Sequence, residues 1–220
     1  MEEYSAEIAK VIGKIIHHCN TAVANKQHKH HAFVETYSLK RAIRTFGDPA
    51  KEAAKSEMKQ LHDRTAFAPI YVNELSQRER HRAMESLLFL VEKRDGRLKA
   101  RNCANGSTQR EFMGKEESTS PTVLTESILL TCIIDAKEGC DVMTGDIPNA
   151  FVQTDANKYK DGDRIIMKIR GVLVNILVSL DPNLYGPAVT YENGEKVLYL
   201  LVLKAIYGML QSSTLYYKKF

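Results

Sequence analysis

A hairpin signal near the middle of the chain most strongly limits its possible folds. Asp95-Gly96 lies between an apolar run of strand length, residues 86–91, and a second segment, residues 97–103. An Asp-Gly pair between two such segments is the strongest short-range signal for a β-hairpin, because both residues accept the backbone conformation of a tight turn. We therefore expect at least one antiparallel pair of strands here.

Four other segments have the character of strands. They are residues 67–72, 140–146, 163–169 and 197–203, and the last is a continuous apolar run suited to a central strand. Residues 170–196, in contrast, contain scattered Gly, Pro and Asn with little pattern. We interpret this stretch as an insertion or a long connection, and the sequence does not decide whether it is ordered.

Helices are predicted between the strands. Residues 2–24 have apolar side chains at helical spacing, and Asp48-Pro49 marks the start of a helix that runs to His62. Residues 123–137 are apolar on most of a helical circumference and end at Gly139, and residues 205–220 can form a last helix. With 220 residues, 44% of them apolar, the chain can bury a core. The predicted fold is α+β, with helices packed on an antiparallel sheet.

Charge is distributed unevenly along the chain, although the formal net charge is only +4. Residues 78–101 contain eight Lys and Arg against four Asp and Glu, whereas residues 135–163 contain seven acids against three Lys. A basic segment suits phosphate groups, and an acidic segment suits a divalent cation.

Other patterns exclude several classes of protein. The four cysteines lie far apart without a C-x-x-C pair, which argues against a disulfide framework and a zinc ribbon. The histidines near Cys19, at 17, 18, 28, 30 and 31, lack fixed ligand spacing, and we interpret them as a solvated helix end and loop rather than a metal site. No apolar run approaches the roughly 20 residues of a membrane span. We expect a soluble, intracellular protein with no membrane partner.

Asp146 is the first candidate for chemistry. It ends the predicted strand 140–146, and a turn at residues 147–149 and the aromatic Phe151 follow it. A carboxylate at a strand tip, followed by a turn with available backbone N–H groups and an aromatic side chain, is how polymerase palms hold a metal-bound nucleotide. The alternative is that Asp146 is an ordinary surface carboxylate.

A series of short motifs closely resembles the reverse transcriptase of copia-type LTR retrotransposons, in both order and spacing. The motifs are residues 93–101, Gln109, residues 120–122, 135–139, 145–151, 197–199 and 204–208. The resemblance runs from about Tyr37 to Phe220 and implies the fingers (about 37–122) and part of the palm (about 123–220) of a right-hand polymerase. Residues 1–36 show no match and are interpreted as an N-terminal helical extension.

The resemblance implies roles for individual residues. Asp146 matches the first catalytic aspartate, a ligand of two Mg²⁺ ions that activate the primer 3′-hydroxyl and neutralise the triphosphate. Phe151 matches the aromatic gate that leaves no room for a 2′-hydroxyl and so selects deoxynucleotides. The residues that match nucleotide-binding positions are Lys99, Arg101, Ile147, Phe151 and Gln211. Alternatively, Phe151 is a core residue, and Lys99 and Arg101 are a solvated strand face.

The sequence also departs from this family. A complete polymerase of this kind carries a later hairpin with an aromatic-x-Asp-Asp turn, which supplies the remaining metal-binding carboxylate, and no Asp-Asp pair occurs in these 220 residues. We therefore expect a chain that stops before this motif and an incomplete Mg²⁺ site. Each tenfold in rate corresponds to only about 1.4 kcal/mol, so the loss of a metal site should lower the rate by many orders of magnitude. We expect no DNA polymerisation by this chain.

The function that the resemblance implies is template-directed deoxynucleotidyl transfer by an RNA-directed DNA polymerase. Its partners would be an RNA or DNA template-primer, dNTPs and the rest of a Gag-Pol type polyprotein, in a cytoplasmic particle or the nucleus. Two alternatives stay open: a non-catalytic nucleic-acid-binding remnant that uses residues 78–101 on phosphates, and a retroelement relic without function.

Overall fold

The computed structural model describes Lys14, residues 35–156, Tyr159 and residues 161–219. The chain divides into two units, Met1–Glu35 and Thr36–Phe220, and every element described below belongs to the second. The helix predicted over residues 2–24 and the histidines between 17 and 31 lie outside the described residues.

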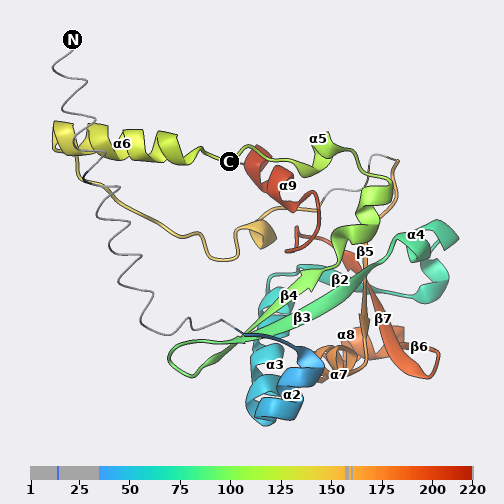
Figure 1. Cartoon of the computed structure of the whole chain (residues 1–220). Helices are drawn as coiled ribbons and strands as arrows, with labels where there is room; N and C mark the ends of the chain where they lie inside the picture. The colour runs from blue at the N-terminus through green and yellow to red at the C-terminus, as the bar shows by residue number, and fades with distance from the viewer. Residues whose placement is uncertain (1–13, 15–34, 157–158, 160, 220) are drawn as a thin grey trace. The chain divides into compact units, whose positions relative to one another are not determined.

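The described residues form a seven-stranded sheet with the order β1-β3-β5-β7-β2, in which β4 also pairs with β3 and β6 with β7 (Figure 1). The strands are β1 (Thr36–Ser38), β2 (Phe67–Ile70), β3 (Met84–Glu92), β4 (Leu98–Ala104), β5 (Ile166–Arg170), β6 (Thr190–Glu192) and β7 (Glu195–Val202). β3 and β5 run parallel, and all other pairs are antiparallel. The fold is therefore mixed α+β with a mostly antiparallel sheet, as the sequence predicts at this coarse level.

Helices connect and cover these strands. They are α2 (Leu39–Phe46), α3 (Asp48–Asp63), α4 (Gln77–Arg82), α5 (Lys115–Ser118), α6 (Thr125–Glu138), α7 (Val172–Leu180), α8 (Pro182–Tyr185) and α9 (Ser212–Lys219). Short 3₁₀ turns are η1 (Val72–Glu74), η2 (Gly106–Glu111), η3 (Phe151–Gln153) and η4 (Gly186–Ala188). The predicted helix over residues 48–62 is confirmed as α3, with Pro49 in its first turn and Ala54, Met58 and Leu61 buried.

The main core lies between the sheet and the helices α3 and α7. Met58 of α3, Leu90 of β3, Met167 of β5, Leu177 of α7 and Leu200 of β7 are fully buried in one cluster. Neighbouring residues on a strand point to opposite faces, so Ile166 and Tyr199 belong to a second, smaller cluster on the other face of the sheet. Apolar clusters therefore cover both faces of the sheet from which the candidate site extends.

The predicted β-hairpin is confirmed. β3 and β4 pair in register, with Val91 opposite Lys99 and Phe89 opposite Arg101, and Gly96 in the turn has a φ of 78°. The face with Leu88, Leu90 and Ala100 is buried, whereas Lys99 and Arg101 are exposed on the other face. The two cations thus share one face, as their spacing predicts.

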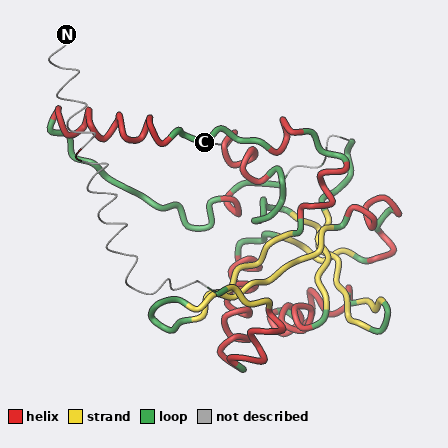
Figure 2. The backbone as a smooth tube through the Cα atoms, in the orientation of Figure 1, coloured by secondary structure: helices red, strands yellow, loops and turns green. Residues whose placement is uncertain are grey.

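The strand predicted at residues 140–146 is wrong, because this stretch is an exposed loop (Figure 2). A strand is stable only when a neighbour satisfies its backbone groups, and no strand of the described chain pairs with these residues. The apolar pattern alone could not supply that neighbour.

Residues 170–196, interpreted as an irregular connection, contain α7, α8 and β6. α7 buries Leu173, Val174, Ile176 and Leu177, and its exposed side carries only two polar residues, Asn175 and Ser179, so the helical period is weak in the sequence. A turn at residues 193–194, with φ of 50° and 80°, then joins β6 to β7 as a hairpin. The last predicted helix is also shorter than expected, because α9 begins only at Ser212.

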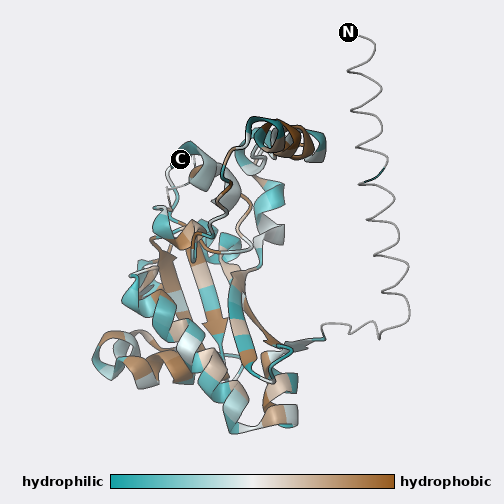
Figure 3. Ribbon diagram, turned by 90° about the vertical axis from the view of Figure 1, so that its left-hand side faces the viewer, coloured by the Kyte–Doolittle hydropathy of each residue, from teal (hydrophilic) through white to brown (hydrophobic). Residues whose placement is uncertain are grey.

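The predicted helix over residues 123–137 is confirmed as α6, and Gly139 ends it in the left-handed conformation with a φ of 69°. None of its residues is buried, and Ile128, Leu130 and Ile134 are 48%, 59% and 44% exposed. The hydrophobic residues of this helix are brown in Figure 3. No helix in the described ranges is long and apolar enough to cross a membrane.

Substitutions in α6 are expected to leave the folded unit almost unchanged in stability. Leu130→Gln and Ile134→Gln remove no buried contact, so the free energy of unfolding should change by less than about 0.5 kcal/mol. Leu90→Ala, which empties a fully buried position, should cost about 2–5 kcal/mol. Urea denaturation followed by circular dichroism measures both. A loss in the α6 variants as large as that of Leu90→Ala would mean that α6 is buried in solution.

Candidate functional site

The predicted site residues do not all lie on the same kind of surface. Asp146 is exposed in the loop after α6, and Ile147 beside it is 39% exposed. Phe151 is partly buried at the start of η3. Gln211, in contrast, is 9% exposed, and its amide Nε2 has no hydrogen-bond partner among the described residues. The position of Gln211 therefore gives it no open surface for a ligand.

Arg101 and Phe151 both contact Tyr207, a residue for which the sequence predicts no role. The guanidinium carbon of Arg101 lies 4.9 Å from the ring centroid of Tyr207, and the Tyr207 ring lies 4.9 Å from the ring of Phe151. The Tyr216 ring of α9 completes the row, 5.9 Å from Phe151. We call these four residues the Arg101 cluster. It joins β4, η3, the segment after β7 and α9.

Two close backbone approaches fix Tyr207 beside β4. The backbone N–H of Ala104 donates to the carbonyl of Tyr207 at 2.7 Å. Gly208 has a φ of 90°, and a Cβ built on it would lie 2.0 Å from the carbonyl oxygen of Ala104. A Cβ on Gly106 would lie 2.3 Å from the carbonyl oxygen of Gly208. Only glycine allows these two chain segments to cross so closely, and the crossing holds the Tyr207 ring next to Arg101.

A buried glutamine, Gln109, is hydrogen-bonded to the chain segment that carries Tyr207. Gln109 is fully buried; its Oε1 accepts from the backbone N–H of Leu210 at 2.8 Å, and its Nε2 donates to the Tyr159 hydroxyl at 3.1 Å. Gln109 is part of the motif series, but neither its burial nor its bonds could be predicted from its position in the sequence. Its role in this structure is to position the turn that carries Tyr207.

The outer edge of β4 is held by α3. The backbone N–H of Asn102 donates to Glu57 Oε1 at 3.0 Å, which satisfies a donor that faces no strand. Burial raises the pKa of Glu57, while the Asn102 bond and the charges of Arg101 and Lys99 act in the opposite direction. Glu57 thus fixes the edge of the strand that carries both cations.

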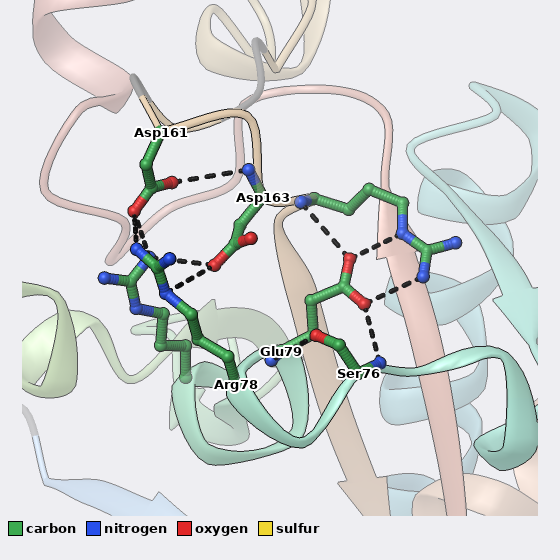
Figure 4. A network of polar contacts seen from close by, with 7 residues as sticks. Ser76, Arg78, Glu79, Asp161 and Asp163 are labelled. Atoms are coloured by element: carbon green, nitrogen blue, oxygen red, sulfur yellow. Dashed lines mark hydrogen bonds and ion pairs between the residues drawn. The ribbon is translucent and has the colours of Figure 1, made fainter.

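The basic segment at residues 78–101 separates into two parts. Arg78 and Arg82 of α4 are paired with Asp161 and Asp163 (Figure 4), and the Arg82 guanidinium also lies 4.0 Å from the Phe112 ring centroid. These pairs neutralise Arg78 and Arg82. The other exposed cations of the segment include Arg80 of α4, whose guanidinium donates to the Val72 carbonyl, and Lys99 and Arg101 of the β3–β4 hairpin.

Several carboxylates of the acidic segment at residues 135–163 are likewise already paired with cations. Asp161 and Asp163 pair with the α4 arginines, and Asp155 pairs with Lys204 at 2.5 Å. Across the part of the chain that the structure describes, no group of three or more His, Cys, Asp and Glu side chains could hold a metal ion. Asp146 alone does not supply the ligand set of a two-Mg²⁺ centre, so we derive no catalytic step through metal ions.

The site that the structure presents is thus a row of aromatic rings with a guanidinium at one end and Lys99 close by on the same strand face. Such a surface can bind phosphates through its cations and stack bases on its rings. Tyr207 and Tyr216 are the residues that sequence reasoning missed, and only Tyr207 had a signal, since it lies within the motif at residues 204–208.

Comparisons with protein-family models, with curated proteins and with solved structures find no significant match to this chain.

Proposed function

We propose that this chain is the fingers and the first part of the palm of a copia-type reverse transcriptase, and that the Arg101 cluster with Lys99 binds the primer-template and the incoming deoxynucleotide. In this proposal Lys99 and Arg101 bind phosphate groups. Phe151 lies under the sugar, and Tyr207 holds Arg101 and Phe151 in place. Asp146 contributes one carboxylate toward Mg²⁺.

The Arg101 cluster is the observation that carries the proposal. Arg101, Phe151 and Tyr207 come from three separate motifs of the family resemblance, at residues 93–101, 145–151 and 204–208. Tyr207 contacts both of the other side chains. Its ring centroid lies 4.9 Å from the guanidinium carbon of Arg101 and 4.9 Å from the ring centroid of Phe151. Motifs that serve one ligand are expected to converge in space, and these three bring an exposed cation next to partly exposed aromatic rings.

The exposed apolar surface of α6 and the loop before Asp146 also agrees with the proposal. Val142 and Met143 in this loop are 65% and 93% exposed. In the family that the sequence resembles, a hairpin with two further aspartates lies beside the first catalytic aspartate. Apolar residues next to Asp146 are therefore expected to be covered when that hairpin is present, either in the same chain or in another.

Binding of a fluorescent primer-template duplex tests the proposal. We expect Tyr207→Ala to weaken binding about tenfold, equivalent to about 1.4 kcal/mol, because Arg101 and Phe151 lose the ring that holds them in place. Tyr207→Phe keeps the ring and should bind like the unaltered chain. Tyr191→Ala, at a tyrosine on β6 that is 65% exposed, is the matched control. Fluorescence anisotropy gives the four dissociation constants, and equal affinity of Tyr207→Ala and the control would overturn the proposed site.

A second function, nucleic-acid binding without catalysis, is favoured by the single carboxylate of the site. Primer extension with Mg²⁺ and dNTPs separates it from polymerase activity. We expect no lengthening of the primer by the 220-residue chain, because one aspartate cannot hold both metal ions. Extension that disappears in Asp146→Asn would show instead that the site is complete.

A further inference from the structure

A groove of about 590 Å³ opens where the sheet divides. On one edge of β3, β5 pairs with residues 84–85 and β1 pairs with residues 89–91. Residues 86–88 between them have a strand partner only on the β4 side among the described strands. The groove lies along this unpaired stretch, and we call it the β3 groove.

The floor and walls of the β3 groove are apolar. Leu39 and Ile43 of α2, Leu87 and Phe89 of β3 and Val172 of α7 all line it and all keep part of their surface exposed. Leu87 is 38% exposed and Val172 is 46% exposed. Apolar side chains that line an open hollow favour an apolar ligand, and this volume falls within the range of about 300–1,000 Å³ typical of small-molecule sites.

The rim of the groove is positively charged on the α2 side. Lys40 and Arg44 lie one helical turn apart, so both extend from the same face of α2 as Ile43. Both are exposed, and neither forms an ion pair or hydrogen bond with any described residue. On the far side, Arg170 is already paired with Glu85 at 3.1 Å, and Glu195 lies beside Gly171. The available cations are therefore those of α2.

We infer that the β3 groove binds an amphiphilic anion, a molecule with an apolar chain and a carboxylate or phosphate head group. The chain would lie over Leu87 and Val172, and the head group would lie between Lys40 and Arg44. Phe89 of the groove lies opposite Arg101, but Lys40, Arg44 and Val172 lie outside the Arg101 cluster, so variants at these three residues test this inference separately from the proposed function. Free fatty acids and membrane lipids share this chemistry, and the experiment distinguishes them.

Titration calorimetry with sodium laurate and with dodecyl phosphate, both below their micelle concentrations, tests the inference. We expect one site with a micromolar dissociation constant and at least tenfold weaker binding by Lys40→Ala/Arg44→Ala. Val172→Ser, at a half-exposed apolar position, should also weaken both ligands. Lys51→Ala/Lys55→Ala removes two exposed lysines of α3 and should leave binding unchanged. Dodecyltrimethylammonium has the same chain with the opposite charge and should bind at least tenfold more weakly than laurate.

Sedimentation with phosphatidylserine vesicles identifies the source of the ligand. Binding that Lys40→Ala/Arg44→Ala removes would assign the groove to a lipid head group, whereas binding of laurate without such a vesicle effect would assign it to a free amphiphile. Absence of binding by both laurate and dodecyl phosphate, or equal affinity of the double variant and the unaltered chain, would overturn the inference.

Discussion

Replacing Gly208 by Ala is expected to destabilise the fold by more than about 3 kcal/mol and to displace Tyr207 from Arg101. The new Cβ would lie 2.0 Å from the carbonyl oxygen of Ala104, which is backbone and cannot rotate away. The φ of 90° is also one that a residue with a side chain rarely adopts. Urea denaturation measures the loss, and duplex binding should fall with it because the cluster depends on this crossing.

Gly96→Ala provides the matched control for this substitution. Gly96 has a φ of 78° in the hairpin turn, but a Cβ there meets nothing within 4 Å. Its cost should be only the conformational one of about 1–2 kcal/mol. Equal losses in the two variants would show that the close approach of Gly208 to Ala104 does not exist in solution.

Glu79→Gln is expected to lower the free energy of unfolding at neutral pH by about 3 kcal/mol. Glu79 is 6% exposed and accepts two bonds from the Arg164 guanidinium, at 2.6 Å and 2.8 Å, so the neutral amide would leave a partly buried cation without its partner. Glu79 also completes a capping box with Ser76 at the start of α4. Thermal and urea denaturation at pH 7 measure the loss.

The pH dependence of this effect follows from the carboxylate. The hydrogen bonds from Arg164 lower the pKa of Glu79 from 4.5 to about 2. A carboxylate with a lowered pKa in the folded state stabilises fully above its ordinary pKa, and this contribution is lost as pH falls from about 4.5 through about 2. The stability difference between the unaltered chain and Glu79→Gln should therefore shrink over this window. A difference for Glu79→Gln that stays constant across this window would contradict the assigned pKa.

Local signals predicted the elements whose stability is local or whose partner is adjacent in sequence. The Asp95-Gly96 hairpin brings its own second strand, and α3 has a capping region and a buried face within one segment. The run at residues 197–203 is apolar on both faces because Leu198 and Leu200 pack in the main core and Val197 and Tyr199 in the second cluster. For the hairpin and α3 the pattern and the structural cause lie in the same short stretch, whereas β7 was predicted from its length and unbroken apolar character.

Features that depend on distant residues could not be predicted in the same way. Residues 140–146 have the pattern of a strand but no described neighbour, and α7 shows only two polar residues, Asn175 and Ser179, on its exposed side. The contact between Arg101 and Tyr207 spans more than a hundred residues and depends on Gly208, whose φ of 90° no propensity encodes. The pairing of Arg78 with Asp161 likewise depends on the fold, and it removes Arg78 from the basic surface that the sequence predicts.

The salt dependence of duplex binding tests the proposed role of this surface most directly. If Lys99 and Arg101 bind phosphates, their joint replacement by Ala should reduce the slope of log K against log salt by about 1.8, since each contact contributes about 0.9. Arg78→Ala should leave the slope unchanged, because Asp161 and Asp163 already pair with that arginine. Our account predicts this contrast in a filter-binding titration with a primer-template duplex. No affinity at low salt, or the same slope in the double variant as in the unaltered chain, would contradict it.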